Sequence, residues 1–264
     1  MLDDPRSSRV KGITRLSQKD ARYETGLFLL EGSQGLKELA KNQELVQEIF
    51  FTATAFGRNQ EVLERFPENL RVEVSDEVMA RMADTKTPQG ILSVVQHVDY
   101  SLDELFRIAP KLLVIVDQGR DPGNVGTIIR AADAAGADGV ILSSDCVDIY
   151  NPKVARATAG SILNIPLVID QDLPAAISRA KNLGLQVFTT SAGGNSIAEL
   201  PEGTLAKPTA WIFGNEAHGV SDSIASLADD SISLPIYGSA ESLNLATAAS
   251  VCLYFTAVAQ RTSR

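Results

Sequence analysis

The chain has 264 residues, of which 44% are hydrophobic and 22% charged, and its formal net charge is −9. This composition is typical of a globular protein and excludes disordered and collagen-like chains. Two cysteines and two histidines are too few for a disulfide framework or for a zinc site built from these residues, so we expect no metal. The chain has no apolar run of about 18 residues, and its first residues do not show the basic and then apolar pattern of a signal peptide. We therefore expect a cytoplasmic protein that does not bind membranes.

The first 97 residues alternate short strands and helices. Apolar runs and period-two alternation predict the strands, and amphipathic stretches with capping residues predict the helices. The expected strands are 28–32, 48–52, 70–74 and the run after the turn TPQG, and the expected helices are 35–47, 59–66 and the one capped by Ser75. Residues 1–97 are therefore expected to form a small α/β domain.

A polar segment, 98–109, is expected to link this domain to a second one, 110–264. In the second domain, continuous apolar runs alternate with helical patterns, which favours a parallel sheet with helices on both faces. The expected strands are 112–116, 139–144, 164–169, 185–190, 209–214 and 231–235, and the expected helices are 125–135, 152–161, 174–183 and 245–260. Ligands of such sheets lie beyond the carboxyl ends of the strands, so the loops that follow the strands are the candidate sites.

The acidic charge is unevenly distributed. Residues 1–97 carry 13 basic and 15 acidic side chains, and residues 98–264 carry 11 and 18. The first 22 residues hold an excess of basic side chains, namely Arg6, Arg9, Lys11, Arg15, Lys19 and Arg22. This basic tract is either a solvated helical face or a surface that contacts phosphates. The net charge does not exclude RNA, because binding depends on the local field of a patch.

The first candidate site is the loop DQGRDPGNVG, which follows the strand 112–116. A glycine-containing loop between a strand and a helix is a common position for a phosphate site. Its spacing matches neither the dinucleotide fingerprint nor the P-loop. Asn124 is either the N-cap of the helix or, together with Arg130, a group that faces an anionic or hydroxyl-bearing substrate.

The second candidate site is the loop GNEAHG, in which Gly214 and Gly219 flank Glu216. Two glycines permit a close approach of the backbone to a ligand. The alternative is an ordinary loop with Glu216 in solvent and Ser221 as the N-cap of the next helix.

The third candidate site is the polar loop that leads into the last helix through Ser242, Leu243 and Asn244. Ser242 or Asn244 either caps this helix or belongs to the site. The helix is apolar nearly all round, which is typical of a core helix or of a subunit interface.

In this order, the patterns N-x-G-x-x-x-R, G-N-E-x-x-G and S-L-N resemble the motifs of the SpoU (TrmH-type) branch of the SPOUT RNA methyltransferases. The segment NPKVARATAGSILNIPLV is also similar to this family. FLLEGSQGLKEL and TPQGIL resemble the small RNA-binding domain that often precedes the catalytic domain. The resemblance implies that S-adenosylmethionine is the cofactor and that a ribose 2′-hydroxyl of RNA receives the methyl group. It favours ribosomal RNA of the 23S type, with transfer RNA as the alternative.

The resemblance also implies a C-terminal α/β/α SPOUT domain with a deep trefoil knot, and a homodimer whose last helix lies between the subunits. In the family, three loops hold the cofactor, largely through their main chain. The corresponding residues here are Thr190, Ser191, Ala192, Gly214, Asn215, Gly219, Ile232, Leu234, Pro235, Ser242, Leu243 and Asn244.

The catalytic residues that the resemblance implies are Asn124, Arg130, Glu216, Ser242 and Asn244. Because a sulfonium is a good leaving group, alignment of the reacting atoms carries much of the rate. Arg130 is effectively always protonated, so it is suited to stabilise a developing alkoxide rather than to act as a free base. Asn124 is expected to position Arg130 and the substrate, and Glu216 to orient either Asn124 or groups of the partner subunit. Ser242 and Asn244 are expected to complete the site and to hold the cofactor end of the last helix.

Two other functions explain part of the sequence. A dinucleotide-binding oxidoreductase would account for the α/β alternation, but the chain lacks the fingerprint GxGxxG. A non-catalytic RNA-binding scaffold would account for the first domain and would leave the motif residues without a role. We expect RNA recognition to involve the basic tract, Lys37 and Lys41, and a groove of the dimer.

Overall fold

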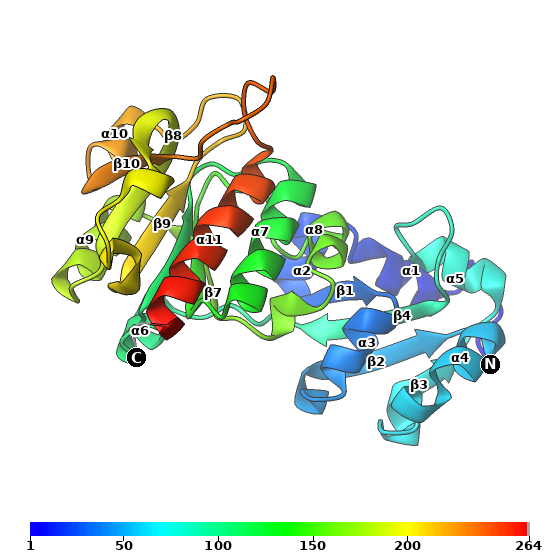
Figure 1. Cartoon of the computed structure of the whole chain (residues 1–264). Coiled ribbons are helices and arrows are strands. Elements are labelled where there is room, and N and C mark those ends of the chain that lie inside the picture. Colours follow the sequence, from blue (N-terminus) through cyan, green and yellow to red (C-terminus); the bar gives the residue numbers. More distant parts are fainter. Residues whose placement is uncertain (263–264) are drawn as a thin grey trace. The chain divides into compact units, whose positions relative to one another are not determined.

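The computed structural model describes residues 1–262 and divides into two compact units (Figure 1). Unit 1 is Met1–Val98 together with Asp148–Asn164, and unit 2 is Asp99–Val147 together with Ile165–Arg264. Unit 1 is therefore built from two separate stretches of chain. The second stretch, Asp148–Asn164, lies within the range 110–264 that is expected from the sequence to be the second domain, but in the structure it packs with unit 1.

The sheet of unit 1 has four strands in the order β1-β4-β2-β3. Their bounds are β1 Leu27–Glu31, β2 Val46–Phe51, β3 Arg71–Glu73 and β4 Ile91–Gln96. β4 lies antiparallel between β1 and β2, with Leu29 opposite Val94, and β3 runs parallel to β2 at the edge. The first five residues of β4 are buried, as expected of a central strand.

The helices of unit 1 are short. They are α1 Ser8–Arg15, α2 Lys19–Thr25, α3 Ser33–Leu39, α4 Ala53–Leu63, α5 Asp76–Met82 and α8 Pro152–Ala157. Ser75 caps α5 as predicted, because its hydroxyl accepts a hydrogen bond from Val78 N. The helix expected at 35–47 is wrong beyond Leu39, because the chain has to turn into β2, which already begins at Val46.

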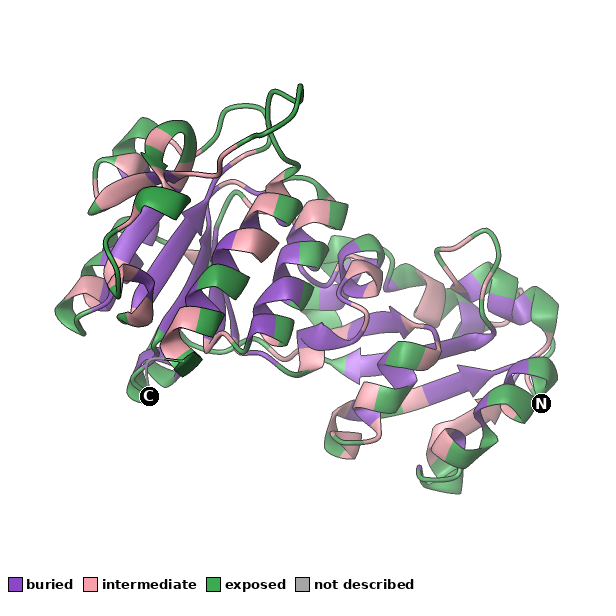
Figure 2. Cartoon of the chain, in the orientation of Figure 1, coloured by how far each residue is buried: buried purple, intermediate pink, exposed green. Residues whose placement is uncertain are grey.

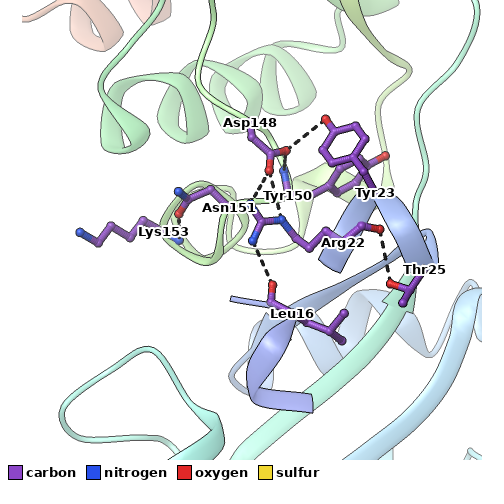
Figure 3. A network of polar contacts seen from close by, with 8 residues as sticks. All are labelled: Leu16, Arg22, Tyr23, Thr25, Asp148, Tyr150, Asn151 and Lys153. Atoms are coloured by element: carbon purple, nitrogen blue, oxygen red, sulfur yellow. Dashed lines mark hydrogen bonds and ion pairs between the residues drawn. The ribbon is translucent and has the colours of Figure 1, made fainter. Parts of the chain in front are cut away.

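A buried ion pair anchors the second stretch of unit 1 (Figure 3). The side chains of Arg22 and Asp148 are only 2% and 6% exposed. Arg22 donates to Asp148 Oδ2 through Nη2 and, at 3.1 Å, through Nε, and its Nη1 donates to Leu16 O at 2.9 Å. The other carboxylate oxygen of Asp148 accepts from Tyr150 N at 2.9 Å. Arg22 is therefore a structural residue and is not available to a phosphate.

Other members of the basic tract also face carboxylates. Arg9 pairs with Glu48, and Arg15 lies 3.6 Å from Glu24. Half of the six basic side chains in the tract thus have acidic partners within unit 1. The interpretation of the tract as a free cationic surface is wrong for these three residues.

Unit 2 contains six parallel strands in the order β10-β8-β9-β5-β6-β7, which confirms the predicted parallel sheet. The bounds are β5 Leu112–Val116, β6 Gly139–Ser143, β7 Leu167–Gln171, β8 Gln186–Ser196, β9 Thr209–Phe213 and β10 Asp230–Ser233. β5 and β9 are buried along their whole length, as Figure 2 shows for the centre of this sheet. Because both faces of these strands are covered, their side chains are apolar at successive positions, and this is why they stand out as continuous apolar runs in the sequence.

Helices cover both faces of this sheet. They are α6 Leu102–Arg107, α7 Pro122–Ala135, α9 Leu173–Asn182, α10 Asp222–Ala225 and α11 Leu245–Thr262. α6, α9 and α10 pack with the β5 residues Leu113 and Ile115 in one core cluster. α7 and α11 cover the other face (Figure 1). There Trp211 Nε1 donates to Thr256 Oγ1 at 2.9 Å.

The segment expected as a linker contains α6. Ser101 and Glu104 form a capping box at the start of this helix, and Leu105 and Phe106 are buried. So short a helix shows no long apolar run in the sequence: it buries only Leu105 and Phe106 and packs the partly buried Leu102 against the core.

The parallel arrangement brings the carboxyl ends of all six strands of unit 2 to one edge of the sheet, where ligands of α/β folds bind. The trefoil knot that the resemblance implies stays a prediction. Within residues 1–262, no helix has both the length and the apolarity that a membrane span requires.

Replacing Arg22 by Met leaves the buried Asp148 carboxylate without its cation. Removal of one member of a buried ion pair costs about 3–5 kcal/mol, so we expect the free energy of unfolding of Arg22→Met, measured by urea denaturation, to fall by this order. Arg9→Met is the control, because it breaks the exposed pair with Glu48 and should cost about 1 kcal/mol or less. Equal losses in the two variants would contradict the role given to Arg22.

Candidate active site

Three loops at the carboxyl edge of the unit 2 sheet bring three polar side chains together. Asn124 Nδ2 donates to Glu216 Oε1 at 3.0 Å, and Asn244 Nδ2 donates to Asn124 Oδ1 at 2.9 Å. Asn124 lies in the first turn of α7, Glu216 in the loop after β9, and Asn244 directly before α11. The three motifs that the sequence singled out therefore form one chain of hydrogen bonds.

The side chain of Asn124 is free for this contact because a different residue caps α7. Asp121 is the N-cap, and its Oδ1 accepts from Asn124 N at 2.7 Å. Pro122 takes the first helical position, which suits its fixed φ. The interpretation of Asn124 as the N-cap is wrong, and both ends of its side-chain amide are used by Glu216 and Asn244.

Asn244 has both of the roles that the sequence left open. Its Oδ1 accepts from Ala246 N at 2.9 Å and from Thr247 N at 3.3 Å, so it caps the start of α11. Its Nδ2 binds Asn124 across the site. The hydrogen bond between these two side chains therefore links the start of α7 to the start of α11.

Gly214 and Gly219 close the loop that carries Glu216. Asn215 N donates to Gly219 O and Gly219 N donates to Asn215 O, both at 2.8 Å. A Cβ on Gly214 would lie 2.1 Å from Val220 N, and Gly219 has a φ of +72°. These glycines bring two stretches of backbone together and so hold Glu216 at the tip of a tight loop.

A cleft of about 530 Å³ lies beside this loop, within the range of roughly 300–1,000 Å³ that is usual for small-molecule sites. Its lining residues come from the middle of β8, the glycine loop, α10 and the turn after it, and β10. They are Thr189, Thr190, Ser191, Ala192, His218, Gly219, Val220, Asp222, Ala225, Ala228, Asp230 and Ser231. The predicted residues Thr190, Ser191, Ala192 and Gly219 are thus brought together.

β8 bulges where it borders the cleft. Ser231 of β10 pairs with Thr189, whereas the next residue, Ile232, pairs with Asn195. The residues between these two pairs, 190–194, therefore leave the regular ladder, and Ser191 Oγ lies 2.9 Å from Ser231 Oγ. The sequence predicts a strand that ends at 190; in the structure the strand continues through this bulge to Ser196.

The other residues expected to hold the cofactor lie outside the lining of this cleft. They are Gly214, Asn215, Ile232, Leu234, Pro235, Ser242, Leu243 and Asn244. Ile232 is buried in β10, and Ser242 and Leu243 lie in the exposed loop before α11. Asn215 Nδ2 donates to Gln118 O at 3.0 Å, which ties the glycine loop to the end of β5.

Arg130 is exposed on α7 and is not part of the hydrogen-bonded chain. It follows Asn124 by six residues, so at about 3.6 residues per turn the two side chains leave the helix roughly 120° apart. The structure therefore does not place Arg130 against Asn124.

Asp117 is a residue of this site that the sequence reading missed. It directly follows β5, and its side chain is almost fully buried. Its Oδ2 accepts from Ser221 N at 2.9 Å and from Ser221 Oγ at 2.7 Å. The feature of the sequence that could have indicated Asp117 is a carboxylate directly after a continuous apolar strand. A side chain in this position is expected to be buried, and a buried charge requires hydrogen-bonding partners nearby.

Cys146 lies next to the loop that follows β5, close to Gly119. Its Sγ lies 3.4 Å from both Val116 O and Ser143 Oγ. Burial raises the pKa of the Cys146 thiol, so the group stays protonated at neutral pH and does not serve as a thiolate nucleophile.

Fold and site define an α/β enzyme domain with a small-molecule cleft at the carboxyl edge of its sheet, next to a cluster of amides and one carboxylate. The model of the SpoU rRNA Methylase family matches residues 111–254, and that of the MRM3-like substrate binding domain matches residues 7–93. The chain belongs to the SpoU rRNA methylase family.

Relatives match over nearly the whole chain. The Bacillus subtilis 23S rRNA (guanosine(2553)-2′-O)-methyltransferase RlmP is 33% identical, over 96% of this chain and 97% of its own length. The 23S rRNA (uridine(2479)-2′-O)-methyltransferase of Streptomyces viridochromogenes is 29% identical, over 94% and 88%. The crystal structure of an AdoMet-bound rRNA methyltransferase from Sinorhizobium meliloti has a TM-score of 0.81 at 30% identity, and the match covers 97% of this chain and 96% of that one.

Asp117→Asn should loosen the glycine loop. The variant keeps the shape of the side chain and removes the charge that Ser221 N and Oγ bind, and such charge-assisted hydrogen bonds contribute roughly 1.5–3 kcal/mol. We expect the hydrogen exchange of the Ser221 amide to accelerate roughly tenfold to a hundredfold. Asp170→Asn, at an exposed position, is the control; unchanged exchange in Asp117→Asn would contradict the role of Asp117.

Proposed function

We propose that this protein transfers a methyl group from S-adenosylmethionine to a ribose 2′-hydroxyl of ribosomal RNA. The observation that carries the proposal is the chain of hydrogen bonds from Glu216 through Asn124 to Asn244, beside a cleft of suitable size, in a member of the SpoU rRNA methylase family. Two relatives bear names that specify 2′-O-methylation of 23S rRNA, at a guanosine and at a uridine.

The cleft suits S-adenosylmethionine in size and in chemistry. The hydroxyls of Thr190, Ser191 and Ser231 offer hydrogen bonds to its polar groups, and the carboxylates of Asp222 and Asp230 offset its positive charge. When bound, this cofactor supplies a methyl group on a sulfonium that departs readily.

The polar residues act on the ribose rather than on the cofactor. Asn124 presents an amide held from both sides, so it orients the nucleotide with little loss of side-chain freedom. Glu216 fixes the orientation of the Asn124 amide. Arg130 leaves α7 in a different direction from Asn124, so its role rests on the family resemblance: it supplies a permanent positive charge that stabilises the alkoxide as the 2′-hydroxyl loses its proton. Ser242 lies in the loop before Asn244 and completes the polar edge of the site.

Unit 1 reads the RNA in this proposal, because residues 7–93 match a substrate binding domain. Its cations contribute unequally. Arg22 is buried, whereas Lys11 and Lys37 are exposed, and Lys41 is exposed as well although it pairs with Glu38 at 2.7 Å. Phosphate contacts therefore fall to the exposed lysines. An rRNA substrate also places the protein where ribosomes are assembled, which in a bacterium is the cytoplasm.

A homodimer forms part of the proposal. α11 exposes Tyr254, Phe255 and Val258, which are 49%, 51% and 57% accessible and lie within about one helical turn of one another. An apolar face on an otherwise buried helix is typical of a subunit interface.

Calorimetric titration with S-adenosylhomocysteine tests the cofactor, and mapping of 2′-O-methyl groups on an unmodified 23S rRNA transcript tests the reaction. We expect saturable binding near one site per subunit and transfer to one ribose. Binding without transfer to ribosomal RNA, but with transfer to a tRNA transcript, would favour the tRNA alternative. Stabilisation by NAD instead would support a dinucleotide-binding enzyme.

Arg130→Ala should abolish transfer and leave cofactor binding intact, because the proposed role of Arg130 is confined to the ribose. Loss of one preorganised charge at a developing oxyanion typically lowers the rate by about 10²–10³. Single-turnover rates and S-adenosylhomocysteine titration separate the two effects. Retained transfer, or weakened cofactor binding, would contradict this role.

Val258→Glu should yield monomers, because it places a charge in the apolar face of α11. The molar mass in solution, measured by light scattering, should fall to that of one chain. Leu183→Glu is the control, since Leu183 is similarly exposed, at 50%, but lies outside α11. A monomeric wild-type protein would exclude the dimer.

A further inference from the structure

The loop between β10 and α11 is exposed from residue 236 to residue 244. One end leaves β10, whose Asp230 and Ser231 line the cleft, and the other reaches Asn244 in the hydrogen-bonded chain. Figure 1 shows it in orange to red, projecting past the first turns of α7 and α11, and Figure 2 shows its exposure. The loop thus borders both halves of the proposed active site.

Tyr237 is the most exposed large apolar side chain in this loop, with 91% of its surface accessible. Within the described part of unit 2, the other exposed aromatic side chains are only about half accessible and lie elsewhere. Tyr254 and Phe255 belong to the face of α11, and Tyr100 lies beside Leu167 at the start of β7, where its N donates to Leu167 O. Tyr237 is therefore the exposed aromatic at the carboxyl edge of the sheet, where the site lies.

The composition of the loop favours contacts with RNA bases over contacts with RNA phosphates. Residues 234–244 read LPIYGSAESLN and contain one acidic and no basic side chain. Such a loop does not attract phosphates. It offers instead a flat aromatic ring flanked by small polar residues, which is the kind of surface on which an unstacked base rests.

The proposed reaction needs such a surface. A ribose 2′-hydroxyl that reaches Asn124 belongs to a nucleotide drawn away from its neighbours, and its base then loses stacking partners. An aromatic ring replaces that stacking without selecting one base, because every base has a π-face. This tolerance is compatible with relatives whose names specify a guanosine and a uridine.

We propose that Tyr237 is a stacking platform for an unpaired base of the RNA at the reaction site. This inference rests on the proposed function and adds a substrate-binding residue to it. Tyr237 binds the RNA in this arrangement and takes no part in holding the cofactor or in joining subunits.

The test compares Tyr237→Ala, Tyr237→Phe and Tyr237→Trp with wild type, with an unmodified 23S rRNA transcript as the probe. Tyr237→Ala should raise the KM for the transcript roughly 5- to 100-fold, the usual effect of losing one base–aromatic stack. Tyr237→Phe and Tyr237→Trp should restore wild-type KM, because they keep the ring. Tyr100→Ala, at the opposite edge of the sheet, is the matched control and should behave as wild type.

Two further readouts separate stacking from other roles. The Kd for S-adenosylhomocysteine and the molar mass in solution should be the same in Tyr237→Ala and in wild type. A weaker cofactor affinity or an altered mass would overturn the proposal, and so would a KM that stays unchanged or that Phe fails to restore. A wild-type protein that binds S-adenosylhomocysteine but methylates no ribosomal transcript would instead remove the proposed function itself.

Discussion

The active site depends on one buried carboxylate. Asp117 directly follows the central strand β5, and its hydrogen bonds to Ser221 hold the far end of the loop that leaves β9. The near end is tied to the same segment through Asn215 and Gln118 O. With both ends fixed, the glycine-closed loop projects Glu216 to Asn124 and forms one wall of the cleft. The buried Asp117 carboxylate requires hydrogen-bonding partners, and the partners it takes determine where the exposed polar groups of the site lie.

The arrangement of these polar groups suits a reaction that needs alignment more than acid–base strength. The residues that meet are two amides and one carboxylate. Cys146, which contacts the ends of β5 and β6, is held protonated by burial, which raises its pKa. Each amide is engaged from more than one side, so it is ordered before any substrate arrives. Preorganised positioning of this kind contributes to rate by removing the need to order groups during the reaction.

The sequence was sufficient for features that depend on local pattern. Buried parallel strands such as β5 and β9 are continuous apolar runs, and the three motifs indeed meet at one edge of the sheet. Features that depend on distant partners were out of reach. Asn124 resembles a helix cap until Asp121 is seen to cap α7, and Arg22 resembles a surface cation until Asp148 is seen beside it. For Asn124, several neighbouring residues could cap the helix and the sequence does not say which one does. For Arg22, the deciding partner lies 126 positions away in the sequence.

The buried pair of Arg22 and Asp148 has a consequence for how the chain folds during its synthesis. The two residues are 126 positions apart, and the stretch Asp148–Asn164 follows β6, in the middle of unit 2. When Val98 leaves the ribosome, unit 1 still lacks its second stretch, and Arg22 has no partner. Unit 1 becomes complete only after β5, α7 and β6 have been made. The N-terminal unit therefore finishes folding while the C-terminal unit is partly built, in contrast to the usual order in which domains fold one after another.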